Sequence, residues 1–122
     1  MLEEANAAVQ AVAPKEAFAW VGRQDTVFID LRDSAELAKD GSIPGAVHMP
    51  RGSLELRIDP ASPSHNPVFS SGKRLVFYCA SGNRSALAGA TALAMGLENV
   101  VHLQGGFRAW KEAGGPIRPP AK

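Results

Sequence analysis

The sequence predicts an α/β domain with a mainly parallel, five-stranded sheet that carries helices on both faces. Short apolar segments rich in β-branched and aromatic residues recur along the chain, each bounded by glycine, proline, aspartate or asparagine. Helical stretches separate these segments, and the links between the two are short. Such alternation is typical of parallel strands, because their crossover helices cover the faces of the sheet.

Five segments are expected to form the strands, and each is short and dominated by apolar residues. They are residues 9–13, 26–31, 46–49, 74–79 and 99–103. The segment 74–79, RLVFYC, is the most apolar of them and ends on the only cysteine. Cys79 is therefore expected at the carboxyl end of a buried strand.

Helices are expected between and after these strands. Pro14 suits the first position of a helix over 15–21, which ends at Gly22. Three further helices are expected over 34–39, 84–95 and 106–112, each followed by a glycine. Two stretches fall outside this pattern. Residues 59–73, rich in proline and serine, are predicted to form a surface loop, and residues 116–122 a C-terminal tail.

Length, composition and charge exclude several classes of protein. With 122 residues, 45% of them hydrophobic and a formal net charge of +1, the chain indicates one globular domain over 1–122. The charge gives no reason to expect nucleic acid as a partner, and no apolar run is long enough to cross a membrane. Glu3 and Glu4 stand where a signal peptide would carry basic residues, so the expected location is the cytoplasm. A single cysteine forms no internal disulfide, and a free thiol suits that reducing compartment.

The chemistry is expected in the loop Cys79-Ala80-Ser81-Gly82-Asn83-Arg84-Ser85, which leads from the strand 74–79 into the next helix. Ligands of parallel α/β sheets bind beyond the carboxyl ends of the strands, beside helix N-termini. The backbone N–H groups of residues 80–85 and the helix dipole favour an anion there, and also the thiolate, the nucleophilic form of cysteine. Gly82 and Asn83 are residue types that tolerate the positive φ that a tight arc needs. Arg84 adds a positive fork able to hold an oxyanion.

The alternative is a structural cysteine, since free cysteines are among the most buried residue types. A glycine-containing turn and an arginine directly after the cysteine, at a strand-to-helix junction, favour the functional interpretation. The loop therefore predicts that Cys79 is a nucleophile and that the surrounding N–H groups and Arg84 bind an anion beside it.

Four stretches of the chain carry a resemblance to a known family. They are FIDLRDSAEL (28–37), with an Asp-x-Arg strand end and an acidic helix start, DGSIPGAVHMP (40–50), CASGNRS (79–85) and GGFRAWKEAGGPI (105–117). In this order and at this spacing they resemble the rhodanese family of sulfurtransferases, and CASGNRS is similar to its active-site loop. The resemblance spans nearly the whole chain and implies a single rhodanese-like domain.

The resemblance implies a two-step, covalent mechanism. Cys79 as thiolate would attack the outer sulfur of a small anionic donor such as thiosulfate, releasing sulfite and leaving a Cys79 persulfide. A thiol, cyanide or a protein acceptor would then take that sulfur. The N–H groups of residues 80–85 would stabilise the persulfide, and the hydroxyls of Ser81 and Ser85 could donate to it. Arg84 would hold the oxyanion of the donor; the alternative is an ion pair with Asp30 or Asp33 that braces the loop.

Two alternatives to a sulfurtransferase stay open. One is a non-enzymatic persulfide carrier or interaction module, and the sequence does not separate it from the enzyme. The other is a small phosphatase or arsenate reductase. Phosphatases of this loop type use Cys-x5-Arg, usually with His before the Cys, whereas this chain has four residues between Cys79 and Arg84, and Tyr78 before the cysteine. The shorter loop favours a sulfur atom over a tetrahedral phosphate.

Three further residues are candidates for the rim of the pocket. Asp30 and Arg32 end the second strand on the same side of the sheet as Cys79, with Glu36 as a candidate partner for Arg32 and a purely structural role as the alternative. Arg51 follows the third strand, where a basic rim would suit an anionic donor, and a solvated surface arginine is the alternative. The chain's histidines show no metal-ligand spacing, so no metal and no cofactor are expected.

Overall fold

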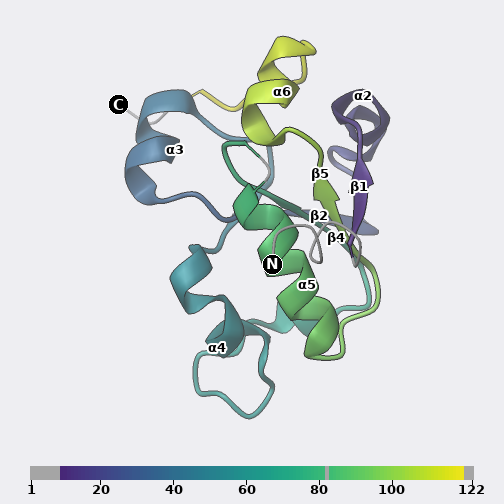
Figure 1. The fold of residues 1–122 in the computed structure, drawn as a ribbon, viewed down its shortest axis with the longest axis vertical. Coiled ribbons are helices and arrows are strands. Elements are labelled where there is room, and N and C mark those ends of the chain that lie inside the picture. Colours follow the sequence, from purple (N-terminus) through teal and green to yellow (C-terminus); the bar gives the residue numbers. More distant parts are fainter. Residues whose placement is uncertain (1–8, 82, 120–122) are drawn as a thin grey trace.

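The computed structural model describes residues 9–81 and 83–119 of the chain. Its strands are β1 (Gln10–Val12), β2 (Thr26–Asp30), β3 (Val47–His48), β4 (Arg74–Tyr78) and β5 (Val100–Leu103). They form one five-stranded sheet in the order β1-β5-β4-β2-β3, and every pair runs parallel (Figure 1). The predicted fold class is confirmed, and β4 lies at the centre of the sheet.

Helices cover both faces of this sheet. The long helix α5 (Asn83–Ala94) lies beside α4 (Leu54–Ile58) on one face (Figure 1). The 3₁₀ turn η2 (Arg51–Ser53) directly precedes α4. The other face carries α2 (Pro14–Ala17), the 3₁₀ turn η1 (Phe18–Trp20) and α6 (Gly106–Glu112). The helix α3 (Ser34–Asp40) follows β2, and a capping box of Asp33 and Glu36 forms its N-terminus. Two separate hydrophobic cores result, one on each face.

Alternate residues of β4 point into different cores. Leu75 and Phe77 belong to the core beneath α5, and Cys79, directly after the strand, belongs to it as well. Val76 and Tyr78 belong to the core beneath α6. This is the two-residue period of a strand that is buried on both faces. It directs the Cys79 side chain toward α5 and the Tyr78 side chain toward α6.

Three sequence predictions differ from the structure. The expected helix over 15–21 is α-helical only over Pro14–Ala17 and continues as the 3₁₀ turn Phe18–Trp20 before Gly22 takes a positive φ of 81°. The helix α4 was not expected, because its apolar Leu54, Leu56 and Ile58 alternate with charged residues and show no helical period. The predicted surface loop 59–73 contains the 3₁₀ turn η3 (Pro67–Ser70), whose Phe69 is buried edge-to-face against Phe77.

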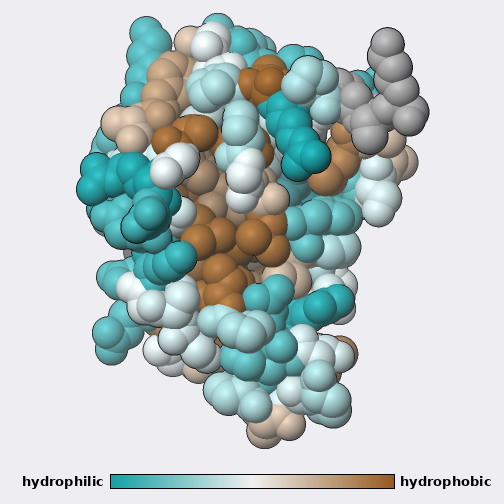
Figure 2. All heavy atoms as spheres, turned by 180° about the vertical axis from the view of Figure 1, so that it is seen from behind, coloured by the Kyte–Doolittle hydropathy of each residue, from teal (hydrophilic) through white to brown (hydrophobic). Residues whose placement is uncertain are grey.

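In the described part of the predicted C-terminal tail, residues 116–119, the backbone of Arg118 forms an isolated antiparallel bridge with Ser42. The side of the molecule opposite to Figure 1 gathers apolar side chains in a central area framed by polar ones (Figure 2). Among the described residues, no helix has the length and apolar character needed to cross a membrane.

Candidate active site

Cys79 lies between the central strand and the N-terminus of the longest helix. The residue directly follows β4 and is fully buried. Its Sγ accepts a hydrogen bond from the backbone N–H of Ser85 over 3.4 Å, and the Ser85 Oγ lies 3.7 Å away. Ser85 belongs to the first turn of α5, where backbone N–H groups and the helix dipole favour negative charge. The sulfur therefore lies in a local environment that stabilises an anion.

Residues 80–83 connect Cys79 to the start of α5. Ala80 is half-buried and Ser81 is exposed, while Gly82 lies outside the described residues. Asn83 is the first residue of α5, and no described non-glycine residue has a positive φ. Asn83 therefore belongs to the helix, and a positive φ in the arc at Gly82 stays a prediction.

The start of α6 supports the loop through its backbone. The N–H groups of Phe107 and Arg108 donate to the carbonyl oxygens of Cys79 and Ala80, over 2.8 and 3.1 Å. Gly106 has a φ of 64°, and a Cβ there would lie 2.5 Å from the Cys79 carbonyl oxygen. Only glycine admits this close approach. The glycine pair 105–106 therefore brings α6 against the active-site loop.

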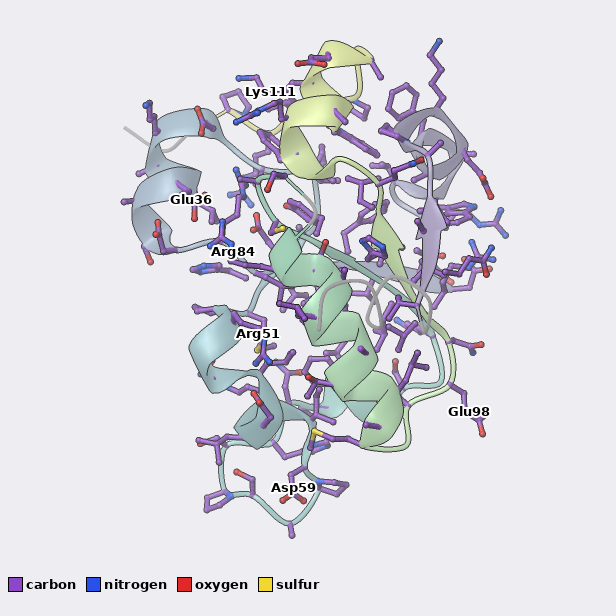
Figure 3. The ribbon with its side chains drawn as sticks, in the orientation of Figure 1. Glu36, Arg51, Asp59, Arg84, Glu98 and Lys111 are labelled. Atoms are coloured by element: carbon purple, nitrogen blue, oxygen red, sulfur yellow. The ribbon has the colours of Figure 1, made fainter. Side chains whose placement is uncertain are left out.

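Arg84 forms an ion pair with Glu36 of α3, over 3.0 Å, and the two side chains point toward each other across the mouth of the loop (Figure 3). The sequence suggested Asp30 or Asp33 as the alternative partner, and this assignment is wrong. Asp33 caps α3 and Asp30 is buried against Arg32. The Arg84 guanidinium holds the pKa of Glu36 below its usual range. Both side chains remain partly exposed, so the guanidinium is accessible from the solvent side.

Asp30 and Arg32 form a fully buried pair behind the loop. Arg32 Nε and Nη2 donate to the two carboxylate oxygens of Asp30 over 3.0 and 2.7 Å, and Nη2 also donates to the Gly41 carbonyl. The Tyr78 hydroxyl donates to Asp30 over 2.7 Å, and burial together with the Asp30 charge raises the pKa of Tyr78. The Arg32 guanidinium stacks 4.2 Å above the Phe107 ring. Glu36 was the wrong partner for Arg32, because the strand period places Asp30 on the same side, two residues away.

Arg51 is partly exposed and contacts side chains of both α4 and α5. Its guanidinium donates to Glu55 over 2.7 Å and to the Thr91 hydroxyl over 3.4 Å. Figure 3 shows it between these helices, further along α5 than Arg84. Its predicted place on the pocket rim stays a prediction.

A cavity of about 330 Å³ opens beside the loop on the side of α6. Ala80, Arg108 and Lys111 contribute to its wall, and the buried Arg32 reaches it from behind. Asp40 and Glu112 line it as well. Three basic and two acidic side chains of the described residues thus line the cavity, a small positive excess that suits an anionic reactant.

Two histidines contact the site, and no sequence pattern pointed to a partner for either. His48 Nε2 lies 2.7 Å from the Arg32 carbonyl oxygen, and the buried His102 lies 3.3 Å from the Ser85 hydroxyl. The alternation of β5 places residue 102 on the same face as Val100, but it does not identify a partner on α5. Within the described ranges, no group of three or more metal-ligating side chains occurs.

The comparisons with known proteins match this geometry. The family model described as the rhodanese-like domain matches residues 13–113. The chain belongs to the rhodanese-like domain family. A sulfurtransferase of Allochromatium vinosum is 33% identical over 97 residues, which are 80% of this chain and 82% of that protein. The human thiosulfate:glutathione sulfurtransferase is 33% identical over 87 residues, 65% of this chain and 74% of that protein.

Among solved structures, a Rhodopseudomonas palustris protein of unknown function, described as a possible tyrosine phosphatase, has a TM-score of 0.93 and 49% identity, over 96% of this chain and 90% of that one. Its description concerns that protein alone. For this chain, the rhodanese-like domain and the sulfurtransferase relatives support sulfur transfer at the level of the family. The predicted family and fold are thereby confirmed.

Proposed function

We propose that the protein is a sulfurtransferase that moves sulfane sulfur from thiosulfate, or from a persulfide donor, to a thiophilic acceptor. Cys79 is the nucleophile and carries the sulfur as a persulfide. A thiol or cyanide is the acceptor, and a protein thiol would serve in the same way. The named activities of the relatives in Allochromatium vinosum and in human support this chemistry.

The reaction consists of two substitutions at sulfur. The Cys79 thiolate attacks the outer sulfur of thiosulfate, a new S–S bond forms, and the S–S bond of the donor breaks with its electron pair leaving on sulfite. The acceptor thiolate then attacks the outer sulfur of the persulfide, which returns the Cys79 thiolate. No oxidant or reductant beyond donor and acceptor is required. Only the outer sulfur atom of the donor has to reach the buried Cys79.

The observation that carries the proposal is the position of Cys79 Sγ, 3.4 Å from the Ser85 N–H at the first turn of α5. Thiolate and persulfide are both anions, and both gain from this donor and from the helix dipole. We assign Arg84 to the oxyanion of the donor. The loop residues Ala80, Ser81, Gly82 and Asn83 complete the cradle in this proposal.

Intact mass spectrometry tests the nucleophile. Incubation with thiosulfate is expected to add one sulfur atom to the protein, and cyanide is expected to remove it. Cys79→Ser is expected to gain no sulfur. Sulfur uptake by Cys79→Ser would show that another residue is the nucleophile.

Two alternatives are separated by turnover. A persulfide carrier would take sulfur from a persulfide donor but turn over little thiosulfate with cyanide. A phosphatase would hydrolyse a phosphate ester and take up no sulfur. The loop argues against a phosphatase, because it has four residues between Cys79 and Arg84 where phosphatases of this loop type have five.

A further inference from the structure

His102 lies beneath the first turn of α5, at the level of Ser85. It stands in β5 beside Phe77 of β4 and Ala11 of β1, and it is only 4% exposed. Its Nδ1 lies 3.3 Å from Ser85 Oγ, the same hydroxyl that lies 3.7 Å from Cys79 Sγ. Its Nε2 is buried and has no hydrogen-bond partner among the described residues. Ser85 thus lies between the nucleophile and a buried imidazole.

The surroundings determine which ring nitrogen carries the proton. Burial lowers the pKa of His102, and its strand neighbours Ala11 and Phe77 carry no charge, so the ring is neutral at neutral pH. A neutral imidazole has one N–H and one acceptor nitrogen. A buried N–H without an acceptor is rarer in proteins than an unpaired buried acceptor. The proton therefore belongs on Nδ1, where Ser85 Oγ can accept it.

We propose that His102 is a positioning residue for the nucleophile: its Nδ1–H donates to Ser85 Oγ and holds that hydroxyl where it can donate its own proton to the sulfur of Cys79. The proposal rests on the proposed function of Cys79 as the residue that carries the transferred sulfur. It assigns His102 no contact with donor or acceptor. The imidazole acts on the sulfur only through Ser85.

The contact matters because the sulfur is anionic both as the attacking thiolate and as the persulfide intermediate of the proposed reaction. A serine hydroxyl rotates freely and can present either its proton or a lone pair to a neighbour. As a thiol, Cys79 donates to Ser85 Oγ over 3.7 Å. As a thiolate or persulfide the sulfur can only accept, and an imidazole N–H on a lone pair of Ser85 Oγ leaves the hydroxyl proton to be donated to it. Hydrogen bonds to an anion are about twice as strong as neutral ones, so a fixed orientation favours thiolate and persulfide.

The test measures the reactivity of Cys79 with iodoacetamide at neutral pH, which requires no sulfur donor, and separately the rate of sulfur uptake from thiosulfate. The variants are His102→Leu, His102→Asn, Ser85→Ala and the double variant of Ser85→Ala with His102→Leu. His102→Leu is expected to slow both reactions about three- to tenfold, as expected for the loss of a hydrogen bond that supports an anion. His102→Asn is expected to recover part of the loss through its amide N–H. Once Ser85 is alanine, His102→Leu should slow the reactions no further.

A matched control is present in the chain. His65 lies 3.0 Å from the Ser70 hydroxyl, in a loop at the opposite end of the sheet from Cys79. His65→Leu is expected to leave alkylation and sulfur uptake unchanged. His65→Leu therefore shows what the loss of any histidine–serine contact does, and His102→Leu shows what the loss of the contact beside Cys79 does.

Nitrogen-15 NMR of the wild-type imidazole tests the same contact without any substitution, so the proposal can be tested even if a variant does not fold. The expected result is the Nδ1–H tautomer of His102, with ring shifts that change when Cys79 becomes a persulfide. An Nε2–H tautomer, or independent effects of the Ser85 and His102 substitutions, would overturn the proposal. If alkylation follows the expected pattern but wild type takes up no sulfur, the proposed function fails and the positioning role stands. If sulfur uptake is normal and His102→Leu changes neither rate, only the positioning role fails.

Discussion

The carboxylate of Glu36 contacts Arg84 with one oxygen and the N-terminus of its own helix with the other. Oε2 accepts from the Arg84 guanidinium over 3.0 Å, and Oε1 accepts from the Asp33 backbone N–H over 3.2 Å. The pair joins two helices that follow neighbouring strands, β2 and β4. A donor oxyanion that binds Arg84 has to compete with Glu36 for the guanidinium.

The first prediction concerns this competition. Arg84→Ala is expected to raise the KM for thiosulfate by about 10- to 100-fold, as the loss of a hydrogen bond to an anion should. Glu36→Gln is expected to lower that KM by roughly two- to fivefold, because the guanidinium then faces an uncharged neighbour. Steady-state kinetics with cyanide as acceptor measures both. Arg23→Ala removes a more exposed ion pair, with Asp25, and serves as the control that leaves the KM unchanged.

An unchanged KM in Arg84→Ala, together with a lower melting temperature, would assign Arg84 to bracing the loop. The same result would remove the oxyanion role from the proposed mechanism. A higher KM in Glu36→Gln would indicate that the ion pair orients Arg84 for the donor and does not compete with it.

The second prediction concerns the glycine beneath the loop. Gly106→Ala places a Cβ 2.5 Å from the Cys79 carbonyl oxygen and 2.7 Å from the Ala80 carbonyl group, at a φ of 64°. Backbone atoms cannot turn away as a flexible side chain can, so we expect a loss of about 3 kcal/mol in the free energy of unfolding. Gly22→Ala is the matched control, because its φ of 81° is equally strained while nothing lies within 4 Å of the added Cβ. Its expected loss is about 1–2 kcal/mol.

Chemical denaturation of both variants measures the difference. The folded fraction of Gly106→Ala should also take up sulfur more slowly, because the loop carbonyls have to move. Equal losses of unfolding free energy in Gly106→Ala and Gly22→Ala would contradict the prediction, because the close approach of the added Cβ to the loop carbonyls would then have no effect on stability.

The third prediction concerns the buried Asp30 carboxylate. Tyr78→Phe removes its hydroxyl donor at 2.7 Å and also the acceptor of the Ile43 N–H. An unsatisfied buried polar group costs about 1–3 kcal/mol, so we expect Tyr78→Phe to lower the free energy of unfolding by about 1–3 kcal/mol. Arg32→Met leaves the carboxylate without its counter-ion and is expected to cost about 3–5 kcal/mol. Urea unfolding of both variants tests the order, and a smaller loss for Arg32→Met than for Tyr78→Phe would contradict it.

Local pattern was enough to predict the framework that presents Cys79. The apolar period of β4 and the turn residues of 80–85 depend on neighbours in the sequence, and the structure has the strand end and the helix start within one residue of the prediction. The partner of Arg32 was open to the same reasoning, since Asp30 lies two residues away on one side of a strand.

The partners of Arg84 and Ser85 could not be obtained in this way. Glu36 is 48 residues from Arg84, and His102 is 17 residues from Ser85. Both contacts depend on the angle at which α3 and α5 lie against the sheet, which small residues such as Ala88 and Ala92 allow but do not define. Packing geometry of this kind emerges only when the whole core is assembled.

The last prediction concerns the pH dependence of stability. Burial lowers the pKa of His102 in the folded state below its ordinary value of 6.5, which the unfolded state restores. Below pH 6.5 the imidazole of His102 takes up a proton in the unfolded chain but not in the folded chain. The free energy of unfolding is therefore highest above pH 6.5 as far as His102 is concerned, and it decreases as the pH falls toward the folded pKa. The wild type should therefore lose up to about 1.4 kcal/mol of unfolding free energy per pH unit in this window from His102. His102→Asn should lose correspondingly less, and urea titrations across the window compare the two slopes. Equal slopes would show that the imidazole is protonated as easily in the folded chain as in the unfolded one.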